Sequence, residues 1–214
     1  MYDSEGRPVK PREPKRVARM PVVSLAILGI CILVFIGVNL LLTIIGKPQY
    51  LYLLTFSPAN GLVFPGIISH MFAHADVWHL VFNMIMLYFL GIMVEMRYGG
   101  WRYALLFLVS GVFAALAQSA FNPGGLLLGA SGALAGVLAA FVRHYPHVKL
   151  YIWGILPIPA WLAAVLWMAY NIIGAQQGGA GIAFVAHLAG FIAGAVISVL
   201  MFTPGRPGAG KPVQ

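Results

Sequence analysis

The sequence predicts an all-α integral membrane protein in which six transmembrane helices form one bundle. Of the 214 residues, 61% are hydrophobic and only 8% are charged, whereas soluble domains carry roughly 25% charged residues. The uncharged intervals are long, and no charged residue lies between Arg102 and Arg143. A helix needs about 20 apolar residues to cross a bilayer. Composition and spacing together therefore exclude a water-soluble fold.

Apolar length and helix-breaking residues predict where each span lies. The six predicted helices cover residues 21–45, 79–96, 101–121, 130–143, 148–173 and 182–202. The first run is too long for the core of a cleavable signal peptide, so we expect it to be retained as a span. Residues 1–20 are expected to form a polar, basic tail and residues 204–214 a disordered tail. Residues 21–203 then form a single domain.

The positive charges predict the orientation of these helices. If the N-terminus is cytoplasmic, the cytoplasmic segments contain 12 of the 13 Lys and Arg residues, and only Lys47 lies outside. Because Lys and Arg stay on the cytoplasmic side of a membrane, we expect both termini to be cytoplasmic. The net charge of +8 therefore indicates membrane topology and not a nucleic-acid partner.

The segment 47–78 is apolar but broken by Pro48, Pro58 and Pro65, so we expect no continuous span there. It predicts a partly inserted outer loop between the first and second helices, built from short helices. The fourth helix is also short, because Ser131 lies only ~18 Å above Arg143 in a hydrocarbon core of ~30 Å. Ser131 is therefore expected below the outer surface, at the bottom of a recessed cavity.

Polar residues on three helices are predicted at a similar depth. Asn83 and His187 lie ~21 and ~24 Å above the inner ends of the second and sixth helices, and His79 is one turn above Asn83 on the same face. Small residues four apart let membrane helices pack closely. Both the fourth and the sixth helix contain them: Gly132 and Gly136, then Gly190 and Gly194. If these two helices pack together, His187 reaches Ser131.

This constellation can support nucleophilic catalysis. A serine hydroxyl becomes an effective nucleophile when a base takes its proton, and a neutral imidazole such as that of His187 can do so near pH 7. The developing oxyanion needs fixed hydrogen-bond donors, which Asn83, His79 and the backbone N–H of Ser131 can supply. No acidic residue lies in the third to sixth helices, so we predict a Ser–His dyad.

Three segments fit the motifs of a known family. Residues 79–83 fit HxxxN, residues 129–132, which begin with Gly129, fit GxSG, and residues 186–194 fit AHxxGxxxG. They occur in the family's order on the second, fourth and sixth helices. Over about residues 21–202, the chain resembles the rhomboid intramembrane serine proteases.

The resemblance implies the six-helix rhomboid bundle, with Ser131 as nucleophile, His187 as general base, and Asn83 and His79 assisting the oxyanion. It implies cleavage of peptide bonds in or near transmembrane segments of other membrane proteins through an acyl-enzyme, with no metal and no cofactor. The fifth helix and the loop 174–181 match the family's mobile gate and cap. With no further domain in view, we expect a prokaryotic plasma-membrane protein whose partners are the bilayer and transmembrane substrates.

One position departs from the resemblance. Some members of the family place an aromatic residue one turn after the serine, against the catalytic histidine. Here that position is Ala135. The sequence therefore leaves open what orients the ring of His187.

Three other hypotheses remain open from the sequence. His70 and His74, four residues apart, could bind zinc with Asp76, although we expect these histidines to form hydrogen bonds that hold the outer loop. A transporter would use His79 and His187 as proton relays, but the inner halves of the helices offer almost no polar path. A catalytically weak, rhomboid-like protein that binds membrane clients should have lost the serine or the histidine, and this chain has both.

Overall fold

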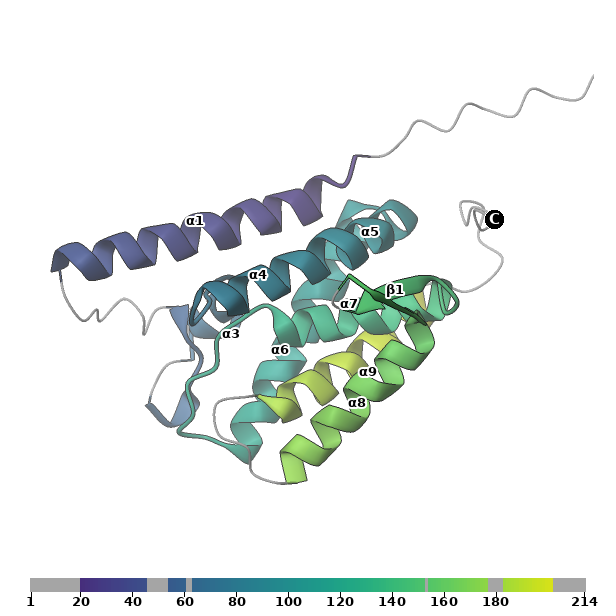
Figure 1. Cartoon of the computed structure of the whole chain (residues 1–214). Coiled ribbons are helices and arrows are strands. Elements are labelled where there is room, and N and C mark those ends of the chain that lie inside the picture. The colour runs from purple at the N-terminus through teal and green to yellow at the C-terminus, as the bar shows by residue number, and fades with distance from the viewer. Residues whose placement is uncertain (1–19, 46–53, 61–62, 153, 177–182, 202–214) are drawn as a thin grey trace, which may run out of the picture.

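The computed structural model describes residues 20–45, 54–60, 63–152, 154–176 and 183–201. Within them, six long helical segments make up most of the molecule (Figure 1): α1 (Val22–Ile45), α4 (Val77–Met86) continued by the π-helical η3 (Leu87–Gly91) and α5 (Ile92–Tyr98), α6 (Gly100–Phe121), α7 (Ser131–His144), α8 (Ala160–Gln176) and α9 (Phe184–Met201). Four of them, α1, the α4–α5 segment, α6 and α9, are long and apolar enough to cross a membrane. The chain is therefore a helical membrane protein, while α7 and α8 are shorter.

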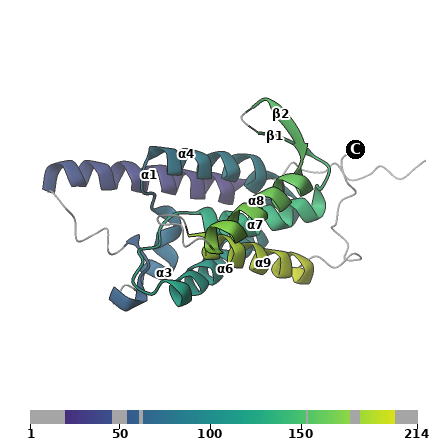
Figure 2. The ribbon, with the colours of Figure 1, turned by 60° about the horizontal axis from the view of Figure 1, so that its bottom comes forward.

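The helix predicted over residues 148–173 is wrong at its start. This part of the chain first forms an antiparallel hairpin of β1 (Lys149–Ile152) and β2 (Leu156–Pro159), and α8 begins only after it. Pro157 and Pro159 lack the N–H that a helix interior needs, and Gly154 takes a left-handed φ of 71° in the turn. Figure 2 shows the hairpin projecting from the end of the bundle.

The helix α7 forms the centre of the bundle. Every residue from Gly132 to Phe141 is buried, and α7 packs against α6 and α9. By contrast, only 17% of the spanning stretch of α1 is buried, and α1 lies along one edge of the molecule in Figure 1. A helix buried on all sides requires small residues where its neighbours approach, and α7 supplies glycine and alanine along most of its length.

The described part of the segment before α4 consists of short helices, η1 (Pro58–Asn60), α3 (Gly66–Ser69) and η2 (His70–Phe72). This agrees with the interrupted pattern of the sequence, although its insertion in the outer leaflet stays a prediction, and residues 46–53 and 61–62 lie outside the described residues. The side chain of Asp76 accepts hydrogen bonds from the backbone N–H groups of Trp78 and His79, at 2.8 and 2.9 Å. This cap starts α4 at Val77, two residues before the predicted start.

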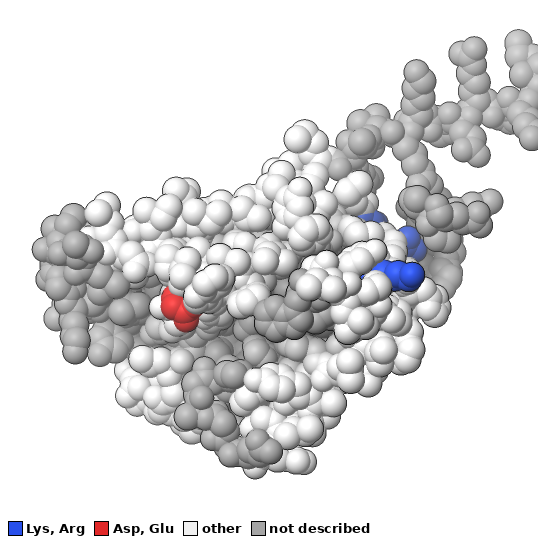
Figure 3. Space-filling view, viewed as in Figure 1, with Lys and Arg blue, Asp and Glu red and all other residues white. Residues whose placement is uncertain are grey.

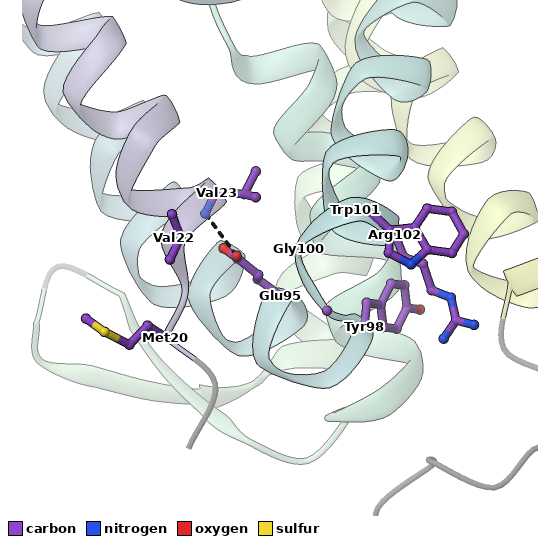
Figure 4. Close-up of a pocket in the computed structure, with 9 residues that line it drawn as sticks. Met20, Val22, Val23, Glu95, Tyr98, Gly100, Trp101 and Arg102 are labelled. Carbon is purple, nitrogen blue, oxygen red and sulfur yellow. Dashed lines mark hydrogen bonds between the residues drawn. The ribbon is translucent and has the colours of Figure 1, made fainter. Parts of the chain in front are cut away.

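The carboxylate of Glu95 holds α1 against α5. Its two oxygens accept hydrogen bonds from the backbone N–H groups of Val23 (2.9 Å) and Ser24 (2.7 Å) at the start of α1, where the helix dipole also favours a negative charge. Figure 4 shows the contact of Glu95 with Val23. Both residues line a hollow of about 640 Å³, which Trp101 and Arg102 also line. The hollow does not include Ser131, so the cavity predicted above Ser131 stays a prediction.

The charged side chains of the described residues lie toward the two ends of the bundle. In Figure 3, the basic side chains visible on this face lie at one end and the acidic side chain lies toward the other, with an uncharged surface between them. The described basic residues are Arg97, Arg102, Arg143 and Lys149, all near helix ends or in the hairpin. An uncharged band between charged ends fits a protein that crosses a bilayer. The predicted tails, residues 1–20 and 204–214, lie outside the described residues except for Met20.

Candidate active site

Ser131 and His187 form a hydrogen-bonded pair. Ser131 is the first residue of α7, and His187 lies in the first turn of α9. The Ser131 hydroxyl lies 2.7 Å from Nε2 of His187, within the 2.6–3.2 Å over which a base can take a proton. Because Ser131 begins α7, its backbone N–H lies in the first turn, where N–H groups have no partner within the helix. The Ser131 hydroxyl, the His187 imidazole and one backbone N–H thus meet at the end of α7.

The pair is brought together by backbone contact between α7 and α9. A Cβ atom added to Gly190 would collide with the carbonyl of Gly132, and one added to Gly194 would collide with the backbone of Gly136. The four glycines predicted from their spacing therefore lie opposite one another. We call this contact the α7–α9 seam, made of Gly132, Gly136, Gly190 and Gly194. Gly190 and Gly194 leave no room for a side chain against α7, whereas a Cβ atom on Gly132 or Gly136 would first meet Ala114 or Ser110 of α6. The distance between Ser131 and His187 thus follows from the close approach of the two main chains.

The loop before Ser131 is held by the outer loop. Leu127 and Phe56 exchange backbone hydrogen bonds of 2.9 and 3.0 Å, and the N–H of Gly129 donates to the carbonyl of His70 at 2.8 Å. Gly129 has a φ of 113°, which L-residues with a side chain rarely adopt. A Cβ atom at Gly129 would also lie 2.6 Å from the ring of His79. Both its backbone and its neighbour therefore require glycine at this position.

His79 and Asn83 lie on the α4 side of the site, but the structure gives neither a hydrogen bond to Ser131. The ring of His79 packs on Gly129, two residues before the serine. Asn83 is buried, and its amide donates to the carbonyl of His79 at 2.9 Å. An amide nitrogen carries two donors, so this bond leaves one N–H of Asn83 for another acceptor. Their role at the oxyanion stays a prediction.

Asn171 is the residue that sequence reasoning missed. It lies on α8, is fully buried, and its Oδ1 atom lies 2.7 Å from Nδ1 of His187. The ring of Trp167, one turn earlier, packs against the same imidazole with centroids 5.2 Å apart and planes tilted by 33°. Trp167 and Asn171 thus both contact the imidazole whose orientation the sequence leaves open. A carboxamide in an otherwise apolar helix was the signal available in the sequence.

The outer histidines His70 and His74 are both buried. Among the described residues, no group of three His, Cys, Asp or Glu side chains lies close enough to hold an ion. Nδ1 of His70 hydrogen-bonds the carbonyl of Gly66 at 2.9 Å, and burial lowers the pKa of His70 to about 4. The ring of His74 packs edge-on against His79 at 5.2 Å. Burial lowers the pKa of His74 to about 4 as well.

Helical fold and site together define a membrane protein with a serine–histidine pair at the end of its central helix. The family model described as the Rhomboid domain matches residues 61–204. This range contains Asn83, Ser131, Asn171 and His187, together with all four glycines of the α7–α9 seam. The chain therefore belongs to the rhomboid family, and the bundle has the rhomboid fold.

Curated proteins of the family are similar over much of the chain. The Rhomboid protease GlpG of Serratia proteamaculans is 30% identical over 184 residues, covering 82% of this chain and 61% of the relative. Rhomboid-related protein 2 of Mus musculus is 32% identical over 160 residues, covering 70% and 52%. Rhomboid protein 1, mitochondrial, of Saccharomyces cerevisiae is 33% identical over 138 residues, covering 60% and 39%. The chain thus spans less than two thirds of the length of these relatives.

Proposed function

We propose that the protein is an intramembrane serine endopeptidase that hydrolyses peptide bonds in or near transmembrane segments of other membrane proteins. The observation that carries the proposal is the 2.7 Å distance between the Ser131 hydroxyl and Nε2 of His187. The similarity to a relative named as a rhomboid protease supports it. The site contains the two groups that acyl transfer needs, a nucleophile and a base in hydrogen-bond contact.

In the proposed reaction, His187 takes the hydroxyl proton of Ser131 while Oγ forms a bond to the scissile carbonyl carbon. The carbonyl oxygen gains the negative charge, which the N–H of Ser131, the free N–H of Asn83 and a ring N–H of His79 would stabilise. The C–N bond then breaks and His187 gives the proton to the leaving amine. Water, deprotonated by His187, attacks the acyl-enzyme, and the acid product leaves as Oγ regains its proton.

The arrangement in the membrane is part of the proposal. We propose six spans with both termini in the cytoplasm of a prokaryotic cell, so that Ser131 lies toward the outer face. The four basic residues of the described part of the chain, near helix ends and in the hairpin, support this orientation. The partners would be the bilayer and transmembrane substrates. We also propose that catalysis needs no metal and no cofactor, since a serine and a histidine suffice for acyl transfer.

The test is covalent labelling with a fluorophosphonate probe, which forms a bond to an activated serine. We expect the wild-type protein to be labelled at Ser131, and the Ser131→Ala and His187→Ala variants to lose both labelling and cleavage of a transmembrane peptide. Labelling that survives in Ser131→Ala would contradict the assignment of the nucleophile. Cleavage lost on addition of a chelator and restored by a divalent metal would overturn the metal-free mechanism.

A further inference from the structure

The base of the proposed protease has a second hydrogen bond on the side opposite the serine. Nε2 of His187 faces Ser131 and Nδ1 faces Asn171, each at 2.7 Å. The three side chains come from three different helices, α7, α9 and α8. The imidazole of His187 is therefore hydrogen-bonded at both nitrogens, to Ser131 at one and to Asn171 at the other.

The orientation of the Asn171 carboxamide follows from its other contact. Its Nδ2 donates to the backbone carbonyl of Trp167 at 2.8 Å, and a carbonyl can only accept. The NH₂ group must therefore face Trp167, which leaves Oδ1 facing His187. Because Oδ1 can only accept, Nδ1 of the neutral imidazole carries the proton, and the lone pair of Nε2 faces the serine hydroxyl. This is the tautomer that a general base requires.

The surroundings keep this orientation fixed. Asn171 is fully buried, at 0% exposure, so water does not compete for its carbonyl oxygen. The Trp167 ring packs on the imidazole from the same helix. An unpaired carboxamide would be costly at such a site, whereas here both ends are satisfied. Since Asn171 and His187 lie on different helices, the bond also ties the base to the packing of α8 on α9.

We infer that Asn171 is a positioning residue that completes a Ser131–His187–Asn171 triad, selecting the tautomer of His187 and aiming its ring at the serine. The inference rests on the proposed function, because it assigns Asn171 a role in that reaction. Asn171 touches neither substrate nor Ser131 in this role and acts only through His187.

The experiment measures the rate of fluorophosphonate labelling of Ser131, and kcat and KM for a transmembrane peptide, from pH 5 to 9. Asn171→Leu removes the acceptor at similar volume, so we expect the plateau rate and kcat to fall about 10-fold with KM unchanged. Asn171→Asp retains an acceptor and adds a negative charge that stabilises the protonated imidazole. It should keep most of the plateau rate, while the acidic limb of the profile moves up by about one pH unit or more.

A matched control lies one turn along α8. A Cβ atom on Gly174 would press on the ring of Phe184 in α9, so Gly174→Ala disturbs the same helix contact but leaves both hydrogen bonds of Asn171. We expect Gly174→Ala to keep the wild-type pH profile.

The outcomes separate the two proposals. If wild-type protein is not labelled at Ser131, the proposed function itself fails. If wild type is labelled and Asn171→Leu has the wild-type plateau, the positioning role is overturned. It is also overturned if Asn171→Leu and Gly174→Ala lose the same activity in proportion to their thermal stability. If Asn171→Leu does not fold, the positioning role is overturned when the acidic limb of the Asn171→Asp pH profile stays at its wild-type position.

Discussion

Two helix contacts meet at His187, and they are built differently. On one side, the α7–α9 seam joins backbones through Gly132, Gly136, Gly190 and Gly194. On the other, α8 reaches the same histidine through the side chains of Asn171 and Trp167. A backbone contact has few ways to rearrange, whereas a side-chain contact can be changed without moving a helix. The distance from Ser131 to His187 is thus fixed by the main chain, and the orientation of the His187 ring by side chains.

The largest effect is expected from breaking the α7–α9 seam. Gly190→Val places a branched side chain where a Cβ alone would already collide with the carbonyl of Gly132. We expect a loss of about 3 kcal/mol or more in the free energy of unfolding and no detectable labelling of Ser131, measured by thermal denaturation in detergent and by the fluorophosphonate probe. The matched control is Gly37→Val on α1, where nothing lies within 4 Å of an added Cβ. A folded and active Gly190→Val protein would contradict the backbone contact.

A hydrogen-bond donor outside these two helix contacts should have the next largest effect. Asn83→Ala removes the amide proposed for the oxyanion, and we expect kcat to fall about 10²- to 10³-fold with KM little changed, measured on a transmembrane peptide. Asn39→Ala is the matched control, because Asn39 donates to the carbonyl of Phe35 as Asn83 donates to that of His79, but lies exposed on α1. Equal effects of the two variants would assign Asn83 a purely structural role.

The outer loop holds the loop before Ser131 through the carbonyl of His70, and a lowered pH should weaken that support. His70 is buried and its pKa is about 4, whereas an unfolded histidine has a pKa of about 6.5. Between these values the unfolded state binds more protons, so stability falls as the pH is lowered. From pH 7 to pH 5, His70 should account for a loss of about 2 kcal/mol.

Thermal denaturation of the wild type and of His70→Gln at pH 7, 6 and 5 measures this difference. The variant should lose less stability than the wild type over this range, because glutamine does not titrate. Parallel curves for the two proteins would show that His70 does not protonate on unfolding in this range.

A smaller effect is expected at the turn before Ser131. Gly129→Ala must hold an alanine at a φ of 113° and against the ring of His79, which costs roughly 1–2 kcal/mol of strain. We expect the labelling rate of Ser131 to fall about 10-fold, as that strain displaces the serine. Gly124→Ala in the same loop has nothing within 4 Å of the added Cβ and should label at the wild-type rate.

The smallest effect should follow from a glycine change at the contact between α8 and α9. The Cβ atom of Gly174→Ala meets the ring of Phe184 first, and a side chain can turn aside where a backbone cannot. We expect less than about 1 kcal/mol of destabilisation, against the much larger loss for Gly190→Val, in the same denaturation experiment. Equal destabilisation of the two variants would contradict the difference between a backbone contact in the α7–α9 seam and a side-chain contact between α8 and α9.

The comparison also shows which parts of the molecule are visible in the sequence. Small residues at four-residue spacing indicate where membrane helices can pack closely. The α7–α9 seam could therefore be predicted from Gly132, Gly136, Gly190 and Gly194. The start of α8 could not, since a continuous apolar run concealed the hairpin at residues 149–159. The two prolines in that run were the physical reason for the break, and apolar length outweighed them in the prediction.

By itself, the sequence determined a helical membrane protein with Ser131 and His187 on neighbouring helices, because apolar length, charge position and glycine spacing are local features of the chain. The family match over residues 61–204 agrees with that fold. Only the tertiary structure decided what lies behind His187. Asn171 and His187 are 16 residues apart on different helices, and their contact depends on how α8 is placed and rotated beside α9. Periodicity within one helix carries no information about that rotation, so the contact of Asn171 with His187 became visible only in the packed bundle.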